Sequence, residues 1–155
     1  MDNGNCPSLS YTEAMALALA QAHKASALCE VPVGAVLMGP DGTILAQTHN
    51  LVEAQKSPLA HAEMLAIAEG LTKMGDKYLM GCTLAVTLEP CPMCMAALCH
   101  ARIGTVVFGA YDPKSGGTVN GPRIASAMHH KPQIIDGITE SECAALLQGF
   151  FATKR

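Results

Sequence analysis

One histidine, one glutamate and two cysteines have the residue types and spacing of a catalytic zinc site. His61 and Glu63 stand two positions apart, and Cys91 and Cys94 follow in the sequence Pro-Cys-Pro-Met-Cys. Zinc favours imidazole and thiolate ligands, and three protein ligands leave one tetrahedral position open. Water in that position becomes a nucleophile near neutral pH. Glu63 is not needed as a ligand, so it is free to move protons.

These four side chains can converge on one ion only if the ion lies beyond the ends of two helices. Pro92 suits the first turn of a helix. On that helix Cys91 and Cys94 lie about 60° apart, at about 100° per residue. His61 and Glu63 are about 200° apart, so they diverge in mid-helix and converge only from a first turn. We therefore predict one zinc ion per chain between two helix N-termini, whose dipoles favour thiolates.

Other interpretations of the cysteine motif stay open. A Cys-x-x-Cys pair can be a redox-active dithiol, or the zinc can be structural. A structural site needs a fourth protein ligand. On the cysteine helix, Cys99 lies about 80° and His100 about 180° round from Cys91, so neither joins that face easily. A zinc module that binds RNA or a partner protein without catalysis is the alternative outside the enzyme class.

Predicted strands and helices alternate around these motifs. Glycine and proline turns bound five apolar strands, at residues 31–38, 43–49, 83–88, 105–109 and 133–136. Helices are predicted at 10–28, 61–74, from 92 onward, at 123–128 and at 139–151, with capping boxes at Ser10 and Thr139 and a glycine C-cap at Gly75. This alternation predicts an α/β fold, a three-layer α/β/α sandwich with a central five-stranded mixed sheet. The first two strands form a hairpin, and the last three are largely parallel.

Composition sets wider bounds. A chain of 155 residues that is 50% hydrophobic can form a single domain, 1–155, with a flexible N-terminus at 1–9. No apolar run approaches the ~18 residues of a membrane span. Asp2 and the lack of basic residues near it do not fit a signal peptide. The seven cysteines, an odd number, indicate a reducing compartment, so we expect the cytoplasm. A net charge of −3 does not by itself indicate a nucleic-acid binder.

Stretches around the metal motifs add a family resemblance. They are Glu30 to Val36, Thr87 to Cys94, Ala101 to Gly104, Val107 to Asp112 and Glu142 to Leu147. Together with His61-Ala62-Glu63 they resemble the cytidine deaminase superfamily and, within it, the bacterial tRNA-specific adenosine deaminases. The resemblance spans roughly residues 10–155.

The resemblance implies a reaction and a substrate. His61, Cys91 and Cys94 would hold zinc, and Glu63 would carry protons while hydroxide attacks C6 of adenine, giving inosine and ammonia. The substrate would be the wobble adenosine of a tRNA anticodon stem-loop, and the protein a homodimer. The residues expected to contact the substrate or line its pocket are Asn50, Val31, Pro32, Leu88, Glu89, Pro90, Asp112 and Phe150.

Several of these assignments have plainer alternatives. Asn50 and Asp112 can be turn residues, and Phe150 can belong to the core. Residues 115–130 differ from the family pattern where RNA contacts are expected. A deaminase of free bases or nucleosides, of the guanine or cytosine type, is therefore a second hypothesis within the same chemistry.

Overall fold

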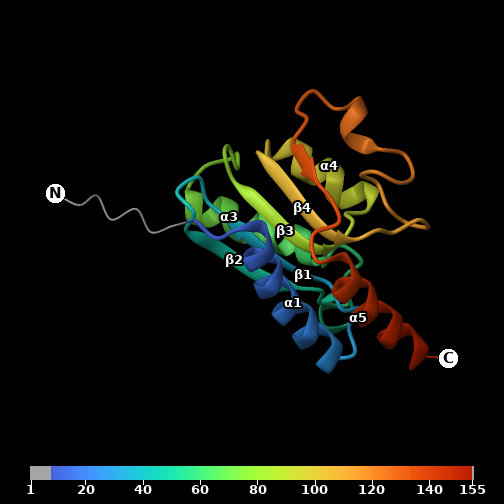
Figure 1. Cartoon of the computed structure of the whole chain (residues 1–155). Helices are drawn as coiled ribbons and strands as arrows, with labels where there is room; N and C mark the ends of the chain where they lie inside the picture. Colours follow the sequence, from blue (N-terminus) through green and yellow to red (C-terminus); the bar gives the residue numbers. More distant parts are fainter. Residues whose placement is uncertain (1–7, 155) are drawn as a thin grey trace.

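In this computed structural model, which describes residues 8–154, a five-stranded sheet forms the centre of the fold (Figure 1). Its strands are β1 (Gly34–Met38), β2 (Ile44–His49), β3 (Thr83–Leu88), β4 (Thr105–Ala110) and β5 (Gln133–Ile135). They lie in the order β2-β1-β3-β4-β5. β1 is antiparallel to β2 and β3, whereas β3, β4 and β5 are parallel. Both the predicted hairpin and the predicted parallel strands are confirmed.

Helices cover both faces of this sheet. They are α1 (Tyr11–Ala27), α2 (Val52–Gln55), α3 (Ala62–Met74), α4 (Pro92–His100) and α5 (Glu140–Ala152), with a 3₁₀ turn, η1 (Ile124–Ala127). Ala35 and Leu37 of β1 pack in one core with α3 and α4. Val36 and Met38 pack in a second core with α1 and α5. This alternation is the two-residue period of a strand buried on both faces, and it confirms the three-layer α/β/α sandwich.

Strand direction brings the metal motifs to one edge of the sheet. Leu88, at the end of β3, pairs with Ala110, at the end of the parallel strand β4. Because β1 is antiparallel to β3, its first residues lie at this edge too, and Ala35 pairs with Val86. The segments after β3 and β4 and the segment before β1 are therefore neighbours. In open α/β sheets ligands bind at the carboxyl ends of parallel strands.

The first helix begins where the sequence predicts. Ser10 Oγ accepts a hydrogen bond from the Glu13 N–H, and the Ser10 N–H donates to the Glu13 carboxylate at 2.8 Å. The capping box is confirmed. Helix α1 then packs directly on β1 at Gly34, where an added Cβ would lie 2.0 Å from the Ala18 carbonyl oxygen. Only glycine permits this approach of the two backbones.

The predicted capping box of the last helix is wrong. Thr139 does precede α5, but it has a φ of 56° and its side chain makes no capping hydrogen bond. An N-cap side chain reaches the helix from the extended region of φ and ψ. Here the Ile138 N–H donates to the Phe108 carbonyl, and Ile138 packs against the α1 and α5 core. Tertiary contacts thus determine how this helix begins.

Two further differences concern the loops and the N-terminus. Residues 50–60, for which no helix or strand was predicted, contain the single helical turn α2. Of the expected flexible N-terminus, residues 1–7 lie outside the described part of the chain. Leu9 packs against the α1 and α5 core.

Within residues 8–154, none of the helices has the length and apolar character that a membrane crossing needs.

Candidate metal centre and substrate pocket

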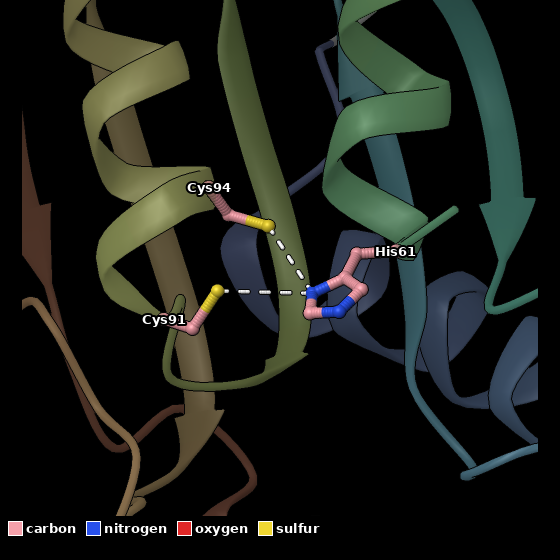
Figure 2. Close-up of side chains that lie close together, drawn as sticks. All are labelled: His61, Cys91 and Cys94. Carbon is pink, nitrogen blue, oxygen red and sulfur yellow. Dashed lines mark hydrogen bonds between the residues drawn. The ribbon is translucent and has the colours of Figure 1, made fainter. Parts of the chain in front are cut away.

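The N-termini of α3 and α4 lie side by side and bring the three predicted ligands together (Figure 2). His61 is the N-cap residue of α3, and Cys91 is the N-cap residue of α4. Cys94 lies in the first turn of α4. His61 Nδ1 is 3.4 Å from Cys94 Sγ and 3.7 Å from Cys91 Sγ. The predicted arrangement, a site between two helix N-termini, is confirmed.

These distances fit zinc. The donor atoms of His61, Cys91 and Cys94 all lie within 4.8 Å of one another. With zinc–sulfur and zinc–nitrogen bonds near 2.3 and 2.0 Å, tetrahedral ligands are about 3.5–3.8 Å apart. Among residues 8–154 no fourth His, Cys, Asp or Glu joins the group. The protein therefore supplies three ligands and leaves one position open, which is the arrangement of a catalytic zinc site.

The pKa values of the two cysteine thiols move in opposite directions. Hydrogen bonding with Cys94 is the main reason that the pKa of the Cys91 thiol falls to about 4, and His61 lowers it further. The same contact raises the pKa of the Cys94 thiol, since its proton is held between the two sulfurs. A divalent cation can replace that proton and stabilise both thiolates. The donor chemistry thus suits a metal that prefers sulfur and imidazole.

Glu63 lies beside the cage formed by His61, Cys91 and Cys94, and its side chain is almost fully buried. It is in the first turn of α3, and only 4% of its surface is exposed. Burial raises the pKa of its carboxyl to about 7, although the nearby His61 opposes this rise. A carboxyl with a pKa near neutrality can both accept and donate a proton at physiological pH. Glu63 lines the same cavity as His61 and Cys91.

A cavity of about 660 Å³ opens onto the cage. His61, Glu63 and Cys91 form part of its wall. Five of the residues predicted to contact substrate also line it: Val31, Asn50, Leu88, Asp112 and Phe150. This volume is within the usual range for small-molecule sites. The strand ends described above explain why Val31, Leu88 and Asp112 converge, whereas Asn50 follows β2 and Phe150 lies on α5.

Three predicted residues do not line the cavity. Pro32 is buried between Val31 and Val33, which do line it, as alternation along an extended chain allows. The Glu89 carboxylate is buried and bonds to backbone N–H groups of residues 112–120. The Pro90 carbonyl accepts hydrogen bonds from this same segment. For these three residues, the expected contact with the pocket is therefore corrected.

Asn50 has its side-chain carbonyl already engaged. Asn50 Oδ1 accepts a hydrogen bond of 2.8 Å from the Ala62 N–H, at the start of α3. Asn50 is 7% exposed, and it lines the cavity. Its amide NH₂ donates to no other group among the described residues. What Asn50 offers to a ligand is thus a hydrogen-bond donor.

Comparisons with known proteins agree with this site. Residues 9–110 match the family described as the cytidine and deoxycytidylate deaminase zinc-binding region. The tRNA-specific adenosine deaminase of Bacillus subtilis is 44% identical over 140 residues, which cover 89% of this chain and 86% of that protein. The chain belongs to this deaminase family. The tRNA-specific adenosine deaminase of Agrobacterium fabrum is 42% identical over 93% of this chain and 95% of its own length.

A solved structure extends the similarity to three dimensions. It comes from biochemical and structural studies of A-to-I editing by tRNA:A34 deaminases at the wobble position of transfer RNA. The two chains superpose with a TM-score of 0.85 at 42% identity, over 88% of this chain and 99% of the other. The deaminase fold expected from the sequence is thereby confirmed.

Some residues of the deaminase pocket were not predicted. The cavity is also lined by Cys29, Glu30, Val33, Val52, Glu53, Ser115, Phe151 and Lys154. Lys154 stands four residues after Phe150, so helical spacing could have indicated it, whereas Phe151 is only one position on and has no such signal. Glu30 has no such local signal. Its buried carboxylate accepts hydrogen bonds from the Glu53 and Ala54 N–H groups, 23 and 24 residues away, and so supports the α2 turn.

Proposed function

We propose that this protein is a zinc-dependent tRNA adenosine deaminase, which hydrolyses adenosine to inosine at the wobble position of an anticodon. The observation that carries the proposal is the three-ligand cage with the buried Glu63 in the wall of the same cavity. Membership of the tRNA-specific adenosine deaminases supports the choice of substrate.

His61, Cys91 and Cys94 would hold one zinc ion per chain. When bound, zinc supplies Lewis-acid chemistry that makes water a nucleophile near neutral pH. The protein's own part is to keep both sulfurs and Nδ1 in place. It does so because His61 and Cys91 stand at the N-termini of α3 and α4, and both helices pack in the hydrophobic core.

Glu63 would carry the protons of the reaction. Its carboxylate takes a proton from the attacking water and delivers it to N1 of the adenine ring. It then moves a second proton from the hydroxyl group added at C6 to the C6 amino group, so that the C–N bond breaks, ammonia leaves and a carbonyl forms at C6. Proton transfer to the departing group avoids expulsion of an amide-like anion. The pKa of about 7 allows one side chain to perform both transfers.

The remaining cavity wall would hold the base. Asn50 can donate to a ring nitrogen or oxygen of the nucleoside, because its carbonyl is occupied by α3. Val31 and Leu88 provide apolar contact for a purine ring. A site that positions the base with a hydrogen bond loses much of its affinity for analogues that lack the acceptor.

Aromatic rings and a cation near the cavity would serve the RNA around the target base. Phe150 and Phe151 stand edge to face at 5.4 Å, and Lys154 Nζ lies 5.2 Å from the Phe150 ring centre. Single-stranded bases stack on such rings, and an anticodon loop presents bases that can be splayed outward. Two of the three Phe in the chain thus line this one cavity.

We further propose a single domain that acts as a homodimer in the cytoplasm. A tRNA substrate and thiolate ligands both suit a reducing compartment. Met95 and Leu98 of α4 are fully buried within the chain, so neither can form the dimer surface. Light scattering on the zinc-loaded protein would measure its oligomeric state.

The deciding experiment compares RNA with free bases. Zinc-loaded protein is incubated with an anticodon stem-loop carrying adenosine at the wobble position and, separately, with adenine, guanine, cytosine and their nucleosides. We expect inosine in the RNA by mass spectrometry, and binding that weakens steeply with salt. Deamination of a free base without any inosine in the RNA would overturn the proposal and favour the free-base hypothesis.

A further inference from the structure

Glu89 is a buried carboxylate that the proposed chemistry does not use. It follows β3 directly and stands two residues before the ligand Cys91. Only 1% of its surface is exposed. A buried carboxylate is costly unless hydrogen bonds compensate for the lost water, so its partners indicate what it does.

Four hydrogen bonds, two to each oxygen, satisfy this carboxylate. Oε1 accepts from the N–H groups of Val119 and Asn120 at 2.8 and 2.7 Å. Oε2 accepts from the Asp112 N–H at 2.9 Å and from Asn120 Nδ2 at 2.8 Å. All four donors belong to residues 112–120, although more than 20 positions separate them from Glu89 along the chain. One side chain therefore holds both ends of that loop.

The loop closes tightly around this anchor. An added Cβ at Gly116 would lie 2.7 Å from the Glu89 carboxyl carbon, and one at Gly117 would lie 2.4 Å from the Pro92 nitrogen. The loop thus packs both on Glu89 and on the first turn of α4. The Pro90 carbonyl adds two more contacts, from the Gly117 N–H and Thr118 Oγ1.

Part of this loop is a wall of the substrate cavity. Asp112 and Ser115 both line the cavity, and Asp112 Oδ1 accepts a hydrogen bond of 3.0 Å from the Ser115 N–H. Glu89 itself does not line the cavity. It can therefore influence the substrate only through the backbone that it holds.

We propose that Glu89 is a positioning residue, whose carboxylate anchors residues 112–120 and so sets the wall formed by Asp112 and Ser115 against the RNA substrate. The inference rests on the proposed function for the identity of that substrate. The anchoring itself rests only on the hydrogen bonds and close contacts above. It also gives a physical reason why Glu-Pro-Cys stands as one unit, since adjacent residues bind the metal and hold the loop.

Glu89→Gln tests this role with little change of volume. The amide group cannot accept hydrogen bonds at one of the two oxygen positions, so two of the four bonds are lost. We expect hydrogen exchange at the amides of 112–120 to accelerate about tenfold or more. We expect KM for the stem-loop to rise roughly tenfold to a hundredfold with kcat little changed, because a displaced wall weakens substrate and transition-state binding alike. Zinc content should stay at one per chain.

Controls separate positioning from a general structural effect. Glu69→Gln makes the same change at an exposed site on α3 and should alter neither exchange at 112–120 nor KM. Asn120→Ala removes only the Nδ2 donor and should give a smaller shift in the same direction, which keeps the test valid if Glu89→Gln fails to fold. Unchanged exchange, an unchanged KM or a loss of zinc in Glu89→Gln would each overturn the proposal. Wild-type protein inactive on RNA would reject the proposed function, while the exchange result would still decide the anchoring.

Discussion

Glu63 and Glu89 are both buried carboxylates near the same cage, yet their pKa values move in opposite directions. Burial raises the pKa of Glu63 to about 7. Burial also pushes the pKa of Glu89 upward, but hydrogen bonds from Asn120, Asp112 and Val119 outweigh it and hold the pKa below its usual value of 4.5. Burial alone therefore does not determine the protonation of either group.

The two carboxylates differ in the hydrogen-bond donors that surround them. Glu89 faces a loop that turns its N–H groups inward, so its charge is satisfied and it holds structure. Glu63 faces a cavity, and its own N–H and the Cys94 thiol do not offset the loss of water. A carboxylate rich in donors is a fixed anion, whereas one poor in donors becomes a proton carrier. The surroundings thus favour different tasks for the two glutamates of one site.

The largest effect is expected at the cage itself. Cys91→Ala removes one of three protein ligands, so we expect the loss of both zinc and all measurable deamination. Metal analysis and the stem-loop assay measure the two losses. Cys99→Ala is the matched control, since Cys99 is buried on the same helix and belongs to no metal group. Activity that persists in zinc-free Cys91→Ala would contradict the assignment of the cage.

The proton-carrier role of Glu63 comes next in magnitude. Glu63→Gln keeps the size of the side chain but cannot take up a proton, so kcat should fall by about 10²–10⁴-fold. Zinc content should not change, because Glu63 is not a ligand. Glu69→Gln, an exposed change on the same helix, should leave kcat unaltered. Near-normal turnover in Glu63→Gln would mean that Glu63 has no catalytic task.

Asn50 can be separated into its two hydrogen-bonding roles. Asn50→Asp keeps an acceptor for the Ala62 N–H and so preserves the support of α3, but it removes the donor that faces the cavity. We expect kcat/KM to fall about ten- to hundredfold while the melting temperature stays close to wild type. Asn50→Ala loses both roles and should also lose roughly 1 kcal/mol of stability. Full activity in Asn50→Asp would reduce Asn50 to a structural residue.

The smallest expected effect is the pH dependence of the stability that Glu89 contributes. Because its folded pKa lies below the unfolded value, Glu89 contributes stability that is fully present above about pH 4.5. That contribution is lost as the pH falls through the folded pKa. The stability gap between wild type and Glu89→Gln should thus narrow between pH 6 and pH 3. Urea unfolding with a chelator present measures the gap without metal release, and a gap that widened in acid would contradict the lowered pKa.

The metal site could be predicted from the sequence because its determinants are local. His61, Cys91 and Cys94 are ordered by the first turns of two helices, and helical geometry follows from spacing along the chain. Pro92 and Gly75 mark helix ends for similarly local reasons. Gly75 takes a φ of 65°, as a C-cap glycine does.

The predictions that failed concern residues whose partners lie far away along the chain. Thr139 has the sequence of a capping box, but the contacts of Ile138 with β4 and the core override it. From the family resemblance, Glu89 was expected to contact the substrate or line its pocket. Its partners lie more than 20 residues away, where no local pattern points. Glu30 and the α2 turn that it supports were not foreseen for the same reason.

The amino-acid sequence by itself therefore determined the three ligands, the proposed proton carrier, and the alternation of strands and helices that carries them. Only the tertiary structure decided how the cavity is walled and which buried glutamate stays charged. The physical reason is one of range. Ligand type and helical spacing act within a few residues, whereas the pKa and orientation of a buried carboxylate depend on N–H donors that distant segments bring to it.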